Sequence, residues 1–144
     1  MRRADGTRTW VWISLLVQGL GYAFDALWHG VLRPGVEPVT YEAMLRHLLT
    51  VHLPLYVGAA SLLVSTATLL VRRRGVALAF GGALLSVVAE AWHAASHLQL
   101  DTHAGPIAGS LSFVGFLIAL SAMVASGRRR GRDAVDASRD RHAA

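Results

Sequence analysis

The chain has 144 residues, of which 53% are hydrophobic and 16% are charged, and it contains no cysteine. This length indicates one domain, and the charge is lower than the roughly 25% that is typical of soluble domains. The lack of cysteine excludes disulfides, iron–sulfur clusters, thiolate zinc sites and catalytic thiols. The sequence pI of about 11.0 does not indicate nucleic acid, because the Arg residues lie at helix ends and in the tail, where topology and anionic lipid account for them.

Four long apolar runs follow one another along the chain and are separated by charged residues or histidine. They cover residues 9–32, 47–71, 75–100 and 104–127. Each run exceeds the roughly 20 residues that cross about 30 Å of hydrocarbon at 1.5 Å per residue. The sequence therefore predicts an all-α integral membrane four-helix bundle over residues 1–127. Residues 128–144 are polar and lack apolar periodicity, which predicts a disordered basic cytoplasmic tail.

The Arg residues are distributed unevenly between the two sides of these four spans. Residues 2–8, 72–74 and 128–132 are rich in Arg and fall on one side, whereas the loop over 99–105 has none. Cytoplasmic loops carry an excess of basic residues, so both termini are predicted to be cytoplasmic in a cell membrane. The expected partner of these basic segments is membrane lipid, with no nucleic acid.

Ionisable side chains gather at one depth within the predicted spans. They are Asp25, His29, His52, Glu90, His93 and His97. Counted from the Arg at the cytoplasmic end of each helix, these groups lie roughly 24 to 35 Å along the axis, at the outer edge of the hydrocarbon. Ionisable groups inside a span are costly and mark functional sites, so we predict a site near the outer face.

The spacing of these residues places them on common helix faces. Asp25 and His29 are four residues apart, and Glu90, His93 and His97 follow at intervals of three and four. A Glu-x-x-His step on a bundle helix also presents both ligands inward in carboxylate-bridged di-iron proteins. We interpret the six residues as metal ligands; for Asp25 and His29 alone, a structural ion pair is the simpler alternative.

Two further histidines lie next to this set without a clear assignment. His47 is five residues before His52, which separates them by about 140° on an ideal helix. We therefore expect His52 to point inward, with Tyr56 one turn below it, and we expect Pro54 to cause a local irregularity. The sequence leaves open whether His47 and His103 join the site.

The ends of the first and third spans also resemble each other. Asp25-Ala-Leu-Trp28-His29 ends one and Glu90-Ala-Trp92-His93 ends the other, so each combines an acid with a Trp-His pair. Each is followed by a return helix with a histidine near its start. This pattern predicts two pseudo-repeated helical hairpins whose acid and histidine sets face each other.

Two resemblances to known families follow from these residues. The Asp25-x-x-x-His29 step near the outer end of a span resembles part of the copper site of membrane copper monooxygenases, which also uses a second histidine further along. The candidates for that histidine, His47 and His52, lie here on a different helix. The string from Asp25 to His29, together with His52-Leu-Pro-Leu-Tyr-Val-Gly58, is similar to a motif in small bacterial multi-span membrane proteins of unassigned activity, which implies a bacterial source.

Three functions fit this constellation. The first is a metal-binding membrane protein that holds copper, iron or zinc, as an oxidoreductase acting on a lipophilic substrate. The second is a haem b electron carrier in which His52 and either His93 or His97 ligate the iron. The third is a proton or ion transport module in which the same groups form a relay, assembled as a homo-oligomer or within a larger membrane complex.

Overall fold

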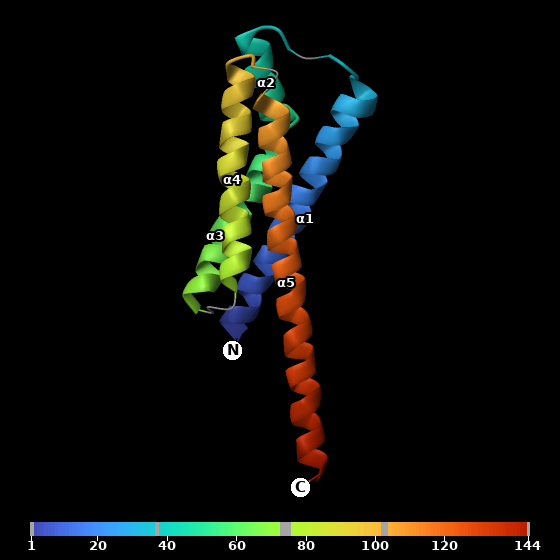
Figure 1. Cartoon of the computed structure of the whole chain (residues 1–144), viewed down its shortest axis with the longest axis vertical. Coiled ribbons are helices and arrows are strands. Elements are labelled where there is room, and N and C mark those ends of the chain that lie inside the picture. The colour runs from blue at the N-terminus through green and yellow to red at the C-terminus, as the bar shows by residue number, and fades with distance from the viewer. Residues whose placement is uncertain (1, 37, 73–75, 102–103, 144) are drawn as a thin grey trace.

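The computed structural model of the chain describes residues 2–36, 38–72, 76–101 and 104–143 and is helical throughout its regular elements (Figure 1). The elements are α1 (Arg2–Leu27), the π-helix η1 (Trp28–Leu32), α2 (Tyr41–Thr50), α3 (Leu53–Arg72), α4 (Ala77–Leu98) and α5 (Ala104–Ala143). Four helical stretches are long and apolar enough to cross a membrane: Gly6–Leu32, Leu53–Val71, Ala77–Leu98 and Ala104–Arg128. The prediction of an all-α protein with four candidate membrane spans is therefore confirmed.

The helices pack as two pairs. α1 packs mainly against α3 and α4 packs mainly against α5, whereas α3 and α4 join the pairs and α1 has few contacts with α5. We call α1 to α3 the first hairpin and α4 with α5 the second hairpin. Figure 1 shows α1 leaning away from the other helices toward the end at which α2 lies.

Glycines allow close backbone contact within each hairpin. A Cβ on Gly58 of α3 would lie 2.5 Å from the backbone nitrogen of Gln18 in α1. In the second hairpin, a Cβ on Gly82 would lie 2.6 Å from the carbonyl oxygen of Gly115, and the reverse distance is also 2.6 Å. Small residues at such crossings let membrane helices approach closely, and dispersion contacts then hold them together.

The two ends of the bundle differ in character. The N-terminal half of α1 lies at the same end as the C-terminus of α3 and the start of α4, and the apolar core there includes Leu15, Leu62, Leu69 and Met123. We call it the terminal end. The opposite end contains η1, α2, the C-terminus of α4 and the start of α5, and we call it the histidine end.

The second predicted span and the tail differ from the sequence-based boundaries. The span begins at Leu53 instead of residue 47, and the residues before it form the separate helix α2. α5 continues to Ala143, so its backbone is helical over 128–143, where the sequence predicts disorder. Ala and Arg, which are among the strongest helix formers, supply much of this segment, and it contains no proline.

Candidate metal centre

Five of the predicted site residues come together at the histidine end. Asp25 is in the last turns of α1, His29 is in η1, and His52 lies in the turn before α3. His93 and His97 occupy the final turns of α4. These side chains line one cavity of about 300 Å³ together with Asp101, Gly105 and Pro106. The structure thus brings together groups that lie up to 72 positions apart in the sequence.

His47 joins them because the second span is broken. Pro54 has no N–H to donate to the carbonyl of Thr50, and its ring would clash with that carbonyl, so α2 ends at Thr50. α3 starts at Leu53, and the N–H of Tyr56 donates to the carbonyl of His52 at 3.0 Å. The 140° separation of an ideal helix no longer applies, and His47 points at His52. The sequence predicted an irregularity at Pro54, and the structure adds that the break between α2 and α3 turns His47 toward His52.

The first hairpin contributes four ligand atoms that lie close together. Nε2 of His52 is 3.2 Å from Nε2 of His47 and 3.4 Å from Oδ1 of Asp25. The same Oδ1 is 3.5 Å from Nε2 of His29, and ligand atoms of the three histidines all lie within 4.8 Å of one another. We call Asp25, His29, His47 and His52 the four-ligand set.

The second hairpin contributes a pair of histidines one helical turn apart. Nε2 of His97 is 3.1 Å from Nε2 of His93, and we call these two residues the α4 pair. Nδ1 of His93 lies 2.9 Å from the carbonyl oxygen of Gly105. Because a carbonyl only accepts, Nδ1 carries the hydrogen, and Nε2 of the neutral ring then has a lone pair that points at His97. Metal-ligating histidines are typically oriented in this way.

Burial separates the members of the cluster. His52 and His47 are buried at 1% and 7% exposure, whereas the side chains of Asp25 and His29 keep 29% and 27%. The ring of Trp28 lies 6.1 Å from that of His47, which is absent from the lining of the cavity. The cavity therefore reaches the cluster from the side of Asp25, His29 and the α4 pair.

The expected partner of His52 is in place. The ring of Tyr56 stacks on the ring of His52, with centroids 5.9 Å apart and planes 18° apart. Its hydroxyl is buried and forms no hydrogen bond with any residue in the described part of the chain. Tyr56 therefore supports His52 through ring contact, which fixes the position of the imidazole plane.

Glu90 lies apart from the histidine groups. It is buried at 5% exposure, and its Oε2 forms no hydrogen bond with any residue that the structure describes. Two groups of three histidines among the described residues have ligand atoms within 4.8 Å of one another, and neither group includes Glu90. Glu90 and His93 therefore do not form a common metal site through the Glu-x-x-His step. His103, the other histidine left open by the sequence, lies outside the described residues.

Below Glu90, polar side chains of three helices form a buried network. Nε2 of Gln18 donates to Oγ of Ser86 at 2.6 Å, Ser86 lies 3.0 Å from Ser112, and the hydroxyl of Tyr22 lies 2.5 Å from Ser112. Gln18, Ser86 and Ser112 are each 0% exposed. The network joins α1 to α4 and α5 beneath the cluster, and no pattern in the sequence had pointed to it.

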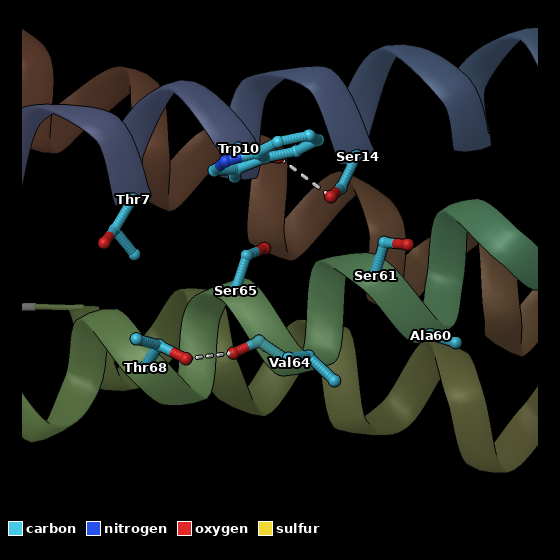
Figure 2. A pocket seen from close by; sticks show the side chains of 8 residues that line it. All are labelled: Thr7, Trp10, Ser14, Ala60, Ser61, Val64, Ser65 and Thr68. Carbon is cyan, nitrogen blue, oxygen red and sulfur yellow. Dashed lines mark hydrogen bonds between the residues drawn. The ribbon is translucent and has the colours of Figure 1, made fainter.

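A larger cavity of about 450 Å³ lies between α1 and α3 toward the terminal end. Figure 2 shows its lining, which consists of Thr7, Trp10, Ser14, Ala60, Ser61, Val64, Ser65 and Thr68. None of these side chains is an acid, a base or a usual metal ligand. The hydroxyls of Ser14 and Thr68 donate to the carbonyls of Trp10 and Val64, each at 2.8 Å. The smaller cavity is the better candidate site, because acids and histidines line it and none lines this larger one.

Comparison with protein-family models, curated proteins and solved structures finds no match to this chain. The resemblances of Asp25-x-x-x-His29 to copper monooxygenases and to small bacterial membrane proteins therefore stay predictions. The functional argument rests on the geometry of the cluster.

Proposed function

We propose that the chain is an integral membrane protein that binds a transition metal ion at the histidine end. One observation carries this proposal: ligand atoms of His29, His47 and His52 lie within 4.8 Å of one another, and Oδ1 of Asp25 lies 3.4 and 3.5 Å from two of these histidines. Ligands of a tetrahedral ion, bound at about 2.0 to 2.1 Å, lie about 3.3 to 3.4 Å apart. Imidazole with one carboxylate suits copper, iron or zinc.

Hydrogen bonding alone accounts for these contacts less well. Nε2 of His52 faces both Nε2 of His47 and Oδ1 of Asp25, at 3.2 and 3.4 Å. A ring nitrogen carries at most one hydrogen, so Nε2 of His52 donates to at most one of these two atoms. A cation between the three atoms would contact all of them at once, and this supports the metal interpretation over a structural ion pair.

The geometry counts against haem b. A haem held by two histidines needs its flat macrocycle between the two rings. The ring of His52 lies only 5.3 Å from that of His93 and 5.5 Å from that of His97, and both contacts are tilted. The adjoining cavity of about 300 Å³ would also have to take the whole macrocycle.

A transmembrane proton or ion relay is also less well supported. A relay must continue to the other face of the membrane through polar groups or water. The polar network reaches Gln18, but the terminal end below it is filled by Leu15, Leu62 and Met123, which are at most 3% exposed. This apolar core lies between the polar network and the terminal end, beside the hydroxyl-lined cavity between α1 and α3.

We further propose that the terminal end is cytoplasmic and the histidine end is the outer one. Among the described residues, the Arg residues at 2–8, Arg72 and those at 128–132 belong to the terminal end or to the tail beyond it, and basic residues mark the cytoplasmic side. The chain has no cysteine, so single cysteines can report each side. Ser138→Cys should react with a membrane-impermeant maleimide only in permeabilised cells, and Val39→Cys, at an 83% exposed position, should react in intact cells. The reverse pattern would overturn this topology.

For the reaction class, we propose oxidation or reduction of a lipophilic molecule in the outer leaflet. The cavity beside the α4 pair favours an exogenous substrate, because it reaches the cluster and is lined by residues of both α1 and α5. Copper and iron support such chemistry, whereas zinc does not. A redox titration of the metal-loaded protein tests this step: the lack of any redox transition would remove it.

The metal proposal itself is tested by elemental analysis together with an absorption spectrum of protein extracted gently from its membrane. We expect stoichiometric copper, iron or zinc and no Soret band. The His52→Ala variant should lose bound metal, while His142→Ala, which removes a tail histidine, should keep it. Protein with neither metal nor haem would contradict the proposal, and a Soret band would favour the haem alternative.

A further inference from the structure

The cluster contains more ligands than one ion uses. Six side chains with metal-ligating atoms gather there, five imidazoles and one carboxylate. Zinc in structural sites takes four ligands in a tetrahedral arrangement. At least two of the six side chains therefore do not bind that ion, and their positions in the cluster identify them.

The four-ligand set combines three histidines, whose ligand atoms lie within 4.8 Å of one another, with a carboxylate oxygen that lies within 3.5 Å of two of them. Its atoms come from α1, η1, α2 and the turn before α3. A tetrahedral ion that took all four atoms would have no position left for an outside ligand. His47 is buried at 7% exposure, its ring lies 6.1 Å from that of Trp28, and it is absent from the lining of the cavity.

The α4 pair has the opposite character. Its Nε2 atoms lie 3.1 Å apart, close to the separation of two ligands on one ion, and the contact between His93 and Gly105 orients one of them. Both side chains line the cavity of about 300 Å³, which Asp25, His29 and His52 also line. A pair of protein ligands leaves further positions on an ion open to a small molecule that enters this cavity.

His52 lies between the two sets. It belongs to both groups of three histidines whose ligand atoms lie within 4.8 Å of one another, one group with His29 and His47 and the other with the α4 pair. An imidazole has two ring nitrogens, and its deprotonated form can ligate one ion through each. The two sites would then be neighbours that share this ring.

We infer that the cluster is a two-metal centre: the four-ligand set holds a coordinatively complete ion, and the α4 pair, with His52 beside it, holds a second ion that is open to exogenous ligands from the cavity. This inference rests on the proposed metal function and adds the number of ions and their division of labour. The first ion organises the helix ends, and the second ion is the one that a substrate reaches.

The test is a titration of chelator-treated, full-length protein with Zn²⁺ and, separately, with Co²⁺ as a spectroscopic probe. Wild type should bind two equivalents, and the double variant His93→Ala with His97→Ala should bind one. The double variant His29→Ala with His47→Ala should lose the other equivalent. Azide should change the Co²⁺ spectrum of wild type and should leave that of the α4 double variant unchanged.

Two measurements keep the outcomes distinct. The α4 pair is also replaced by glutamine, which preserves polarity and much of the volume, and circular dichroism checks that every variant remains helical. One equivalent in wild type, with both double variants losing it, would overturn the two-metal inference and leave the proposed function intact. No binding of either ion in wild type would overturn both. If azide altered the Co²⁺ spectrum of the α4 variants as much as that of wild type, the assignment of the open ion would be overturned.

Discussion

The first hairpin reaches the histidine end through irregular helix ends, whereas the second reaches it through a regular helix. α1 passes into a π-helical turn, in which the N–H of Arg33 donates to the carbonyl of Trp28 at 2.8 Å, and the return segment is broken at residues 51–52. α4 instead runs unbroken from Ala77 to Leu98. A regular helix places two ligands one turn apart but cannot surround an ion, so the breaks supply the extra directions.

This difference explains why one half brings four candidate ligands together and the other brings two. π-helical turns occur often at functional sites, where they change the direction of side chains. Here η1 carries His29, and the break before α3 turns His47 toward His52. Irregularity in the first hairpin and regularity in the second can be disturbed separately, which makes the comparison testable.

The largest effect is expected from closing the helix crossings with bulk. Gly58→Leu places a side chain against the backbone of Gln18, where even a Cβ would lie at 2.5 Å, so we expect α1 and α3 to separate and stability to fall by about 3 kcal/mol or more. The four-ligand set should lose its metal as a result. Thermal unfolding in detergent and metal content measure the two effects.

Gly115→Leu provides the matched disturbance of the second hairpin, because its Cβ would meet the backbone of Gly82 and Ser86. This variant should lose stability to a similar degree, with the metal of the four-ligand set affected less than in Gly58→Leu. Gly81→Leu is the control, since nothing lies within 4 Å of its Cβ. Equal loss of metal in both crossing variants would show that the hairpins do not act separately.

A smaller effect is expected from repairing the helix break. Pro54→Ala restores an N–H that can donate to the carbonyl of Thr50, which favours a continuous helix through residues 51–52. His47 would then turn away from His52, and we expect affinity for Zn²⁺ at the four-ligand set to fall about 10- to 100-fold, as for the loss of an orienting partner. Isothermal titration calorimetry measures this change.

Pro106→Ala is the matched control for that substitution. Pro106 lies in the first turn of α5, where its missing N–H has no intrahelical acceptor, and it lines the cavity beside the α4 pair, so its replacement should leave affinity at the four-ligand set unchanged. If Pro106→Ala weakened binding as much as Pro54→Ala, the effect would come from the loss of a proline and not from the helix break.

The smallest effect is expected where α4 ends. Leu100 has φ of 56°, and the N–H groups of Leu100 and Asp101 donate to the carbonyls of His97 and Ser96 at 3.0 and 2.9 Å. This is a Schellman turn with leucine in place of the usual glycine. Leu100→Gly removes a strain of about 1 to 2 kcal/mol and loses about 0.5 to 1 kcal/mol to chain entropy. A slightly higher unfolding temperature should follow, and a decrease would contradict this account.

Most of the fold could be predicted from the sequence because it depends on length and hydropathy. The four spans follow from apolar runs bounded by Arg, and the depth of Asp25 and His97 follows from residue counting. Helix geometry also predicted that Asp25 and His29 share a face, and their atoms lie 3.5 Å apart. These features need only the rise and the period of a regular helix.

The remaining features depend on departures from that geometry. Pro54 predicted an irregularity, but its place and its effect on His47 follow from tertiary packing. Glu90 had the same helical spacing as a ligand, yet it belongs to neither histidine group of the described residues, an outcome that depends on how α4 packs against the other helices. A one-dimensional pattern contains neither the closeness of a helix crossing nor the direction in which a broken helix resumes.

The location of the four-ligand set has a consequence for how the protein is made. All four of its members precede Leu53, so they have been synthesised before any residue of α4. The nascent chain therefore offers a complete set of ligands while the ribosome is still translating the second hairpin. Metal captured at that stage would fix the ends of α1 and α2 first, and the later hairpin would dock against a surface that is already assembled.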